Sequence, residues 1–334
     1  MMLEQYEEAL LKQMIKKYQH SFASVEFSQP GWDFLVKTGY PMLKLGQRFN
    51  GYGLPDKQQD LFIFELAKSD SIQPDLINKL FYLDIVNSSE QDSLTKDIES
   101  IVGSSDDMFF VFPNDDKGFV DHQIIINGYI GSVFSTNNKN SFILNVVINN
   151  KIYVFLLPSY TVGIRINDLT IMNKPVKSII GNSLRLDLNE ALLSFTVENQ
   201  APYFLIQRLN RILFFYALGF CEKMLDLLKA RIMKRKQFFK TLSEFQSIRF
   251  SYAKLYADLS ILKAQINDLN QGDGIDRCQI MLAKNLLQRC MKTSMQYFGA
   301  YGLLSESSIS HYYRFGGHLI LNINQILERT RHDY

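Results

Sequence analysis

Two helix-periodic segments that meet at a short basic string constrain this chain more than any other feature. Apolar residues before the string recur every three or four positions, as on one face of a helix: Leu213, Phe214, Ala217, Leu218, Cys221, Leu225 and Leu228. The same steps return after the string at Phe245, Ile248, Tyr252, Leu255, Leu259 and Leu262. We therefore predict that residues 234–259 form one long helical stretch with a chemical seam in it.

The seam is the tetrapeptide Arg235-Lys236-Gln237-Phe238. Arg235 offers a planar fork of N–H donors suited to phosphate, and Phe238 offers an apolar face to a flat ring. The two side chains together are suited to hold an anion and a ring at once. A solvated basic turn is the alternative interpretation.

The string resembles the acyl-CoA dehydrogenase motif R-x-x-F-G-x-x-x-x-x-x-Q, with Arg235, Phe238, Phe239 in place of the family's glycine, and Gln246. A second family motif, Q-x-x-G-G-x-G, is matched by residues 296–302, and the family's E…YR by Glu306, Tyr313 and Arg314. The resemblance covers nearly the whole chain. It implies that Arg235 and Phe238 reach across a dimer interface to the FAD of the neighbouring subunit. It also assigns Gln296 and Gly299 to that cofactor site.

The order of elements predicts an α+β, mostly α fold like that of the acyl-CoA dehydrogenases. Residues 1–106 read as an N-terminal helical domain, in which Gly51, Gly53 and the Glu65-Leu66-Ala67 string resemble family loop and helix signatures. Residues 107–198 carry β-branched and aromatic runs separated by Asn, Asp, Gly and Pro, which predicts a middle antiparallel β domain. Residues 199–334 read as a C-terminal four-helix bundle.

The resemblance is weakest in the middle domain. The family's T-E-P-x-A-G-S-D loop, which contacts flavin and acyl chain, is Phe112-Pro113-Asn114-Asp115-Asp116-Lys117-Gly118 here. The family's W-I-T-N string, which lies against the flavin ring, is Phe134-Ser135-Thr136-Asn137. Phe134 and Thr136 thus keep an aromatic ring for stacking and a hydroxyl for a hydrogen bond. A strand end followed by an Asn-rich turn is the alternative.

The carboxylate base of the family is missing at the expected positions. In the family this base removes the proton α to a thioester while the β hydrogen leaves as hydride to the flavin. Ungapped counting from Arg314 places the base at Ile323, and a second alignment places it at Leu321. Residues 207–211, where some members carry the base, hold no carboxylate either. Rescue by Glu328, by Asp115 or Asp116, or by a partner subunit remains an alternative.

Composition narrows the remaining function classes. A net charge of +2 argues against a nucleic-acid partner, which usually requires a strongly basic surface. The three cysteines, in helical contexts, indicate reduced thiols in a cytoplasmic protein, and we expect neither a signal peptide nor a membrane span. His311 and His318 could share a helix face, but no further ligand is placed to complete a metal site.

Three functions follow from these observations. The first is a non-catalytic, degenerate subunit that pairs with an active FAD-dependent acyl-thioester dehydrogenase and lends it Arg235 and Phe238. The second is an FAD-dependent oxidoreductase that acts on an acyl-CoA or an acyl carrier protein with a non-standard base. The third is a flavin-free binding or scaffold protein, favoured by Phe239 and Ala300 in place of glycines. In all three we expect a homo- or hetero-oligomer formed through the C-terminal bundle.

Overall fold

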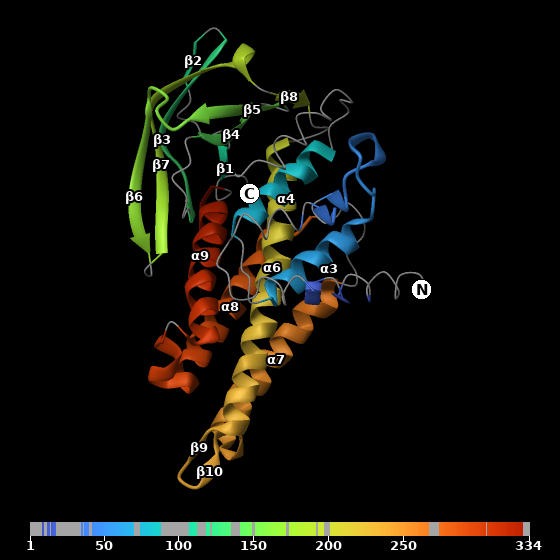
Figure 1. Cartoon of the computed structure of the whole chain (residues 1–334), viewed down its shortest axis with the longest axis vertical. Coiled ribbons are helices and arrows are strands. Elements are labelled where there is room, and N and C mark those ends of the chain that lie inside the picture. Colours follow the sequence, from blue (N-terminus) through green and yellow to red (C-terminus); the bar gives the residue numbers. More distant parts are fainter. Residues whose placement is uncertain are drawn as a thin grey trace. The chain divides into compact units, whose positions relative to one another are not determined.

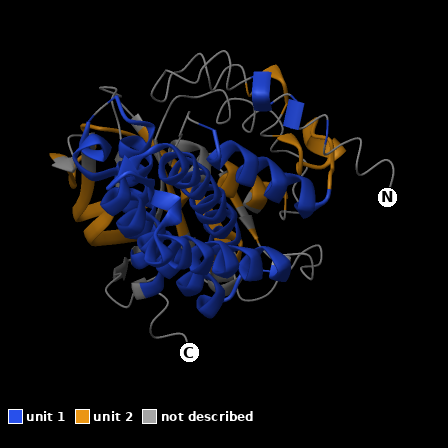
Figure 2. Cartoon of the chain, turned by 90° about the horizontal axis from the view of Figure 1, so that it is seen from below, with its two compact units in different colours: residues 1–31, 55–72, 209–334 blue, residues 32–54, 73–208 orange. Residues whose placement is uncertain are grey.

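The protein folds in the predicted order of helices, strands and helices (Figure 1). The computed structural model describes residues 9, 12–13, 15–17, 35, 37–39, 42–69, 74–87, 107–111, 118–120, 122–134, 141–148, 151–171, 174–191, 193–196, 201–266, 274–304 and 306–329. These group into two compact units, coloured in Figure 2. Unit 1 comprises residues 1–31, 55–72 and 209–334, and unit 2 comprises residues 32–54 and 73–208. The α+β, mostly α fold class is confirmed, whereas the three domain boundaries stay predictions.

The helices that precede the strands are short. The 3-10 helix η2 (Gln47–Phe49) is followed by α3 (Asp56–Ala67) and α4 (Pro74–Asn87). Pro55 precedes the first turn of α3, a position compatible with its fixed φ and missing N–H. Within the described ranges, none of the helices combines the length and the apolar character that a bilayer span requires.

The strands of unit 2 form two four-stranded sheets. The first has the order β1 (Asp107–Val111), β4 (Ser141–Ile148), β5 (Lys151–Pro158) and β8 (Leu193–Thr196). The second has the order β2 (Gly118–Val120), β3 (Gln123–Phe134), β7 (Lys174–Asp187) and β6 (Ile164–Ile171). Among the described strands, β1 and β4 pair in parallel, and every other pair is antiparallel.

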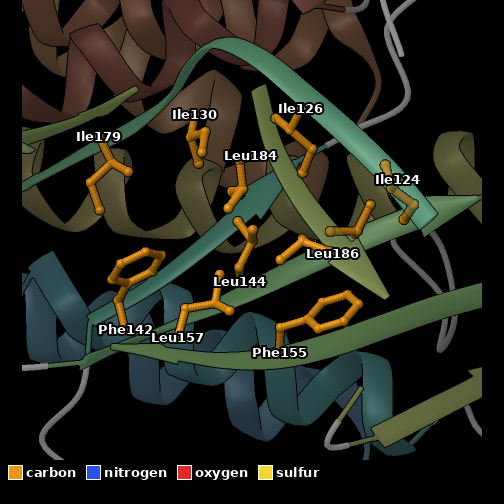
Figure 3. Close-up of a cluster of buried hydrophobic side chains, with 11 residues drawn as sticks. Ile124, Ile126, Ile130, Phe142, Leu144, Phe155, Leu157, Ile179, Leu184 and Leu186 are labelled. Atoms are coloured by element: carbon orange, nitrogen blue, oxygen red, sulfur yellow. The ribbon is translucent and has the colours of Figure 1, made fainter. Parts of the chain in front are cut away.

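The core of the two sheets follows from alternation along each strand. Every second residue of a strand points to the same side, so alternating apolar residues build one buried face. Strands β3, β4, β5 and β7 contribute buried Ile, Leu, Phe and Val side chains to this core. These are Ile124, Ile126, Ile130, Phe142, Leu144, Val146, Phe155, Leu157, Ile179, Leu184 and Leu186. Figure 3 shows these side chains turned toward one another between the strands.

The C-terminal region consists of α6 (Ala201–Lys234), α7 (Gln246–Ile266), α8 (Arg277–Phe298), the 3-10 segment η6 (Gly299–Leu303) and α9 (Ser308–Arg329). Residues 208–221 of α6 are buried without interruption, which is typical of a helix covered on all sides. A side chain at Gly219 would place its Cβ 2.3 Å from the carbonyl oxygen of Phe64, so only glycine allows α3 to approach α6 this closely.

The seam between α6 and α7 is not helical, so the prediction of one continuous helical stretch is wrong at this point. The helix α6 ends at Lys234 and α7 begins only at Gln246. Between them lie strands β9 (Lys236–Gln237) and β10 (Lys240–Thr241) of a hairpin and a turn of 3-10 helix, η5 (Leu242–Glu244). The periodic apolar residues on both sides were read correctly, but they do not show where the chain reverses direction.

Candidate functional site

The seam hairpin is closed by two phenylalanines in an unfavourable backbone conformation. Gln237 pairs with Lys240, which leaves Phe238 and Phe239 as the two loop residues, at φ values of 50° and 63°. Two positive φ values are the hallmark of a type I′ turn, which favours Asn and Gly. A bulky residue in the left-handed region costs about 1–3 kcal/mol. The local backbone therefore does not explain why both residues are phenylalanine.

Both phenylalanine side chains are exposed to solvent. The exposed fraction is 84% for Phe238 and 105% for Phe239. The hairpin lies between the end of α6 and the start of α7, at the tip labelled β9 and β10 in Figure 1. Exposed aromatic rings on a strained, ordered turn are typical of an anchor for a binding partner.

The base of the hairpin is held in place by hydrogen bonds. The backbone N–H of Leu242 donates to the carbonyl of Arg235 at 2.9 Å, and the Leu242 side chain is buried. A capping box follows, in which the backbone N–H and the hydroxyl of Thr241 donate to Glu244 Oε1 at 2.8 and 2.9 Å. The bond from the Thr241 backbone lowers the pKa of Glu244. The hairpin is thereby presented in a fixed geometry at the start of α7.

Two arginines meet the C-terminal end of α8. Arg235 Nη1 lies 3.4 Å from the carbonyl oxygen of Tyr297 and 3.2 Å from that of Phe298. Arg231 Nη2 lies 3.5 Å from the same Phe298 oxygen, and its guanidinium stands 5.1 Å from the ring of Tyr301 and 5.5 Å from the ring of Phe298. Cations at a helix C-terminus oppose the partial negative charge of its free carbonyls.

The geometry leaves donors of Arg235 unused. Within the described part of the chain its hydrogen bonds go through Nη1 alone, so Nε and Nη2 retain donors for an anion. Arg231 Nε is buried and has no hydrogen-bond partner among the same residues. One guanidinium can therefore cap α8 and contact a phosphate at once.

Gly299 closes α8 in a conformation that only glycine adopts readily. Its φ of 64° and ψ of −149° lie in a region that is essentially restricted to glycine. A Cβ at this position would stand 3.4 Å from Arg235 Nη1. The structure thus brings Gly299 and Arg235, which are 64 positions apart in the printed sequence, into one site.

Among the described residues, no contact joins the remaining predicted site residues to Arg235. Gln296 is exposed on α8, and Gln246 is exposed at the first position of α7. Phe134 is described by its backbone only, as the last residue of β3, where it pairs with Val176 of β7 in unit 2. Thr136 lies outside the described residues.

The positions predicted for the catalytic base are apolar in different environments. Ile323 has an exposed fraction of 0% on α9, whereas Leu321 on the same helix is exposed. The side chain of Glu328 lies outside the described residues, as do Asp115 and Asp116. A carboxylate at position 323 would be fully desolvated in this fold, which raises the pKa of an acid strongly.

The sequence patterns did not reveal the buried ion pairs of residues 207–211, the segment in which some family members carry the base. In unit 1, Arg211 Nη2 lies 2.6 Å from Asp60 Oδ2, and Nη1 lies 3.7 Å from Asp56. In unit 2, Arg208 Nε lies 3.7 Å from Asp84. Asp56 and Asp60 are four positions apart at the start of α3, on one helix face, and that spacing is the signal that could have revealed them.

The two histidines of α9 lie in different environments. No group of three or more metal-ligating side chains occurs among the residues that the structure describes. His318 is buried and shares a hydrogen bond of 3.2 Å with Asn322 Nδ2, and His311 is half-buried. Burial lowers the pKa of His318 to about 3, so its imidazole is neutral at physiological pH.

Comparison with known proteins supports the sequence resemblance. Residues 207–316 match the family described as acyl-CoA dehydrogenase, C-terminal domain. Comparison with curated protein sequences finds no match.

Solved structures resemble the chain over nearly its full length. The ChsE4–ChsE5 complex from Mycobacterium tuberculosis matches with a TM-score of 0.73 and 14% identity, covering 98% of this chain and 94% of that chain. Butyryl-CoA dehydrogenase from Megasphaera elsdenii matches with a TM-score of 0.69 and 15% identity, with 96% of both chains covered. The prolyl acyl carrier protein oxidase AnaB matches with a TM-score of 0.71 and 13% identity, with 97% of both covered. At these identities the likeness establishes the fold.

Proposed function

We propose that this chain is a non-catalytic subunit of the acyl-CoA dehydrogenase family, whose C-terminal domain matches residues 207–316 and whose fold it shares. In this proposal it pairs with an active, FAD-dependent dehydrogenase of acyl thioesters. It contributes Arg235 and Phe238 to the FAD that the partner holds. The exposed hairpin that carries both side chains is the observation on which the proposal rests.

The hairpin fits a role outside its own subunit. Phe238 is 84% exposed, so its ring is available to another chain. Arg235 is held by the α8 carbonyls and still offers N–H donors through Nε and Nη2. A side chain that is already fixed loses little conformational entropy on binding, which favours affinity.

The residues at this site fit FAD. Its pyrophosphate is an anion that the remaining guanidinium donors of Arg235 can bind, because guanidinium and phosphate match in geometry. Lys240 on hairpin strand β10 is exposed and adds positive charge beside it. Phe238 offers an apolar face to an aromatic ring of the cofactor. When bound, FAD would supply the hydride acceptor of the partner's reaction.

The side chains at the expected base positions support a non-catalytic role. Ile323 and Leu321 cannot accept a proton, and Ile323 is fully buried. In residues 207–211, Arg208 pairs with Asp84 of α4, and Arg211 pairs with Asp60 of α3. General-base catalysis contributes about 10²–10⁴-fold, and the reaction starts with that proton transfer. The ChsE4–ChsE5 structure is a complex of two different chains, which provides a precedent for pairing within this fold.

The test compares flavin content with and without a partner. The tagged chain is purified from its own host, and any co-purified acyl-CoA dehydrogenase homologue is identified by mass spectrometry. Absorbance near 450 nm then gives the FAD bound to the complex and to the chain alone. We expect flavin in the complex and none retained by the isolated chain.

Arg235→Ala is the informative variant, and Lys236→Ala on the same hairpin is its matched control. A hydrogen bond to a charged group contributes about 1.5–3 kcal/mol. Loss of the Arg235 contacts should therefore weaken FAD retention by about tenfold or more. Lys236→Ala should leave most of the flavin bound. Unchanged flavin in the Arg235→Ala complex would exclude the proposed role, and an isolated chain that retains FAD and is bleached by acyl-CoA would identify an enzyme instead.

A further inference from the structure

Arg231 lies one helical turn before Arg235, and the two guanidinium groups meet at one acceptor. The backbone N–H of Arg235 donates to the carbonyl oxygen of Arg231 at 2.9 Å. Both side chains then converge on the carbonyl oxygen of Phe298, which lies 3.5 Å from Arg231 Nη2 and 3.2 Å from Arg235 Nη1. The proposed function uses Arg235 and leaves Arg231, which none of the sequence patterns singled out, without a role.

Aromatic rings hold Arg231 more than hydrogen bonds do. Its guanidinium stands 5.5 Å from the ring centre of Phe298 and 5.1 Å from that of Tyr301, within the range of a cation–π attraction. The two rings stack on each other at 6.5 Å, with 18° between their planes. Among the described residues, the buried Nε of Arg231 has no hydrogen-bond partner. Burial of an unpaired donor is unfavourable, and an apolar side chain would cover the rings without that cost, so packing alone does not explain a cation here.

The charge and the place of Arg231 both bear on its neighbour Arg235. Two cations that bind one oxygen repel each other, and the partial burial of both side chains reduces screening by water and salt. Arg231 also covers the rings of Phe298 and Tyr301, on which Arg235 would otherwise be free to lie. Both effects favour a conformer of Arg235 in which Nη1 stays on the α8 carbonyls while Nε and Nη2 point away from the rings.

We propose that Arg231 is a positioning residue, which orients the guanidinium of Arg235 toward an anion held by the partner subunit. Arg231 itself touches no ligand. It acts by repelling Arg235 and by covering the rings of Phe298 and Tyr301. The inference rests on the proposed function for the identity of the anion, which is the FAD pyrophosphate, whereas the orientation of Arg235 is a property of the isolated chain.

Nuclear magnetic resonance of the isolated chain tests this orientation without flavin. The Nε–H signal of Arg235 is assigned with Arg235→Lys, which removes it. In Arg231→Ala the repelling charge is lost and the rings are uncovered, so Arg235 should fold onto them, and its Nε–H signal should move upfield through the ring currents. Arg231→Lys keeps the charge and should restore the signal. Lys229→Met is the matched control, because Lys229 is an exposed cation two residues away, on nearly the opposite side of α6.

The co-purified complex gives a second measurement, the dissociation constant of FAD, from the flavin released on dilution. Fixing a free side chain at a binding site weakens affinity by about a factor of ten, so Arg231→Ala should raise this constant about tenfold. Arg231→Lys should restore most of the affinity, and Lys229→Met should bind FAD as the unchanged protein does. Circular dichroism of each variant confirms that the helices are retained.

The outcomes separate this inference from the proposed function. An Arg235 signal that does not move in Arg231→Ala overturns the positioning role, even if Arg235→Ala depletes the flavin. Full rescue by Arg231→Met, which is uncharged, would show that packing suffices and overturns it as well. A signal that moves as expected, together with flavin that is insensitive to Arg235→Ala, supports the positioning role and refutes only the assignment of FAD as the anion.

Discussion

Replacing Phe239 by glycine should make the isolated protein more stable. Phe239 occupies the left-handed region at a φ of 63°, and its side chain is 105% exposed. The substitution therefore removes backbone strain and sacrifices no buried apolar surface. This behaviour is the reverse of the usual effect of glycine, which destabilises ordered structure by increasing the freedom of the unfolded chain.

The magnitude follows from two opposing terms. Relief of the left-handed conformation is worth about 1–3 kcal/mol for a residue of this kind. The added freedom of the unfolded chain subtracts about 0.4–1 kcal/mol. The net gain is about 1 kcal/mol, equivalent to a rise of about 2–4 °C in the midpoint of thermal unfolding for a domain of about 150–250 residues.

Scanning calorimetry of the isolated chain measures this shift. The matched control is Leu282→Gly, because Leu282 is also an exposed apolar residue but lies in α8. Glycine in a helix interior is destabilising by about 1 kcal/mol relative to alanine, so the control should unfold at a lower temperature. A lower midpoint for Phe239→Gly as well would refute the reasoning, since it would mean that the Phe239 side chain stabilises the folded state. In the complex with a partner, the same variant should bind more weakly, because the second exposed ring is lost.

Two further predictions concern buried ionisable groups. The pKa of His318 is lowered to about 3 in the folded state, so only the unfolded chain binds a proton at this site between about pH 6.5 and pH 3, and the free energy of unfolding falls with the pH. Chemical denaturation at pH 7 and pH 5 measures this loss. Between these two pH values the free energy of unfolding of His318→Gln should fall by about 2 kcal/mol less than that of the unchanged protein. Asp60→Asn should lower the free energy of unfolding by about 3 kcal/mol because it leaves a buried guanidinium poorly compensated, whereas Asp258→Asn, which breaks an exposed pair with Arg289, should cost less than about 1 kcal/mol. A similar loss for the two asparagine variants would show that burial does not set the strength of these pairs.

The positions of several strands along the chain were predictable from the sequence. The runs that contain Ile124, Phe142 and Phe155 alternate or concentrate β-branched and aromatic residues, and all three lie in strands of the sheet core. Strand β6 (Ile164–Ile171) has a weaker pattern, because Asn167 and Asp168 stand among its apolar residues. Local patterns report which segments are strands, but pairing such as the parallel contact of β1 and β4 depends on residues far apart in the chain.

The candidate site was predictable only in part, for a similar reason. Motif spacing identified Arg235 and Gly299 separately, and the structure shows that they lie beside each other at the end of α8. No sequence period marks a hairpin inside a helical region when its loop is Phe238-Phe239 in place of the expected glycine or asparagine. The buried pair of Arg211 and Asp60 was equally hidden, because burial of a charge is decided by the helices that surround it.

The strain at Phe239 bears directly on the choice among the three functions. A flavin-free scaffold with no partner at the hairpin would gain stability from glycine at this position, since nothing in the described chain covers the ring. Retention of two exposed phenylalanines in left-handed backbone is instead expected when both rings become buried in an assembly, where each contributes about 1.5–3 kcal/mol. Helix α7, which follows the hairpin, also exposes two large apolar side chains, Phe250 at 64% and Ile261 at 59%. Both features are explained if this chain acts as one subunit of a larger complex, and neither is explained by an isolated monomer.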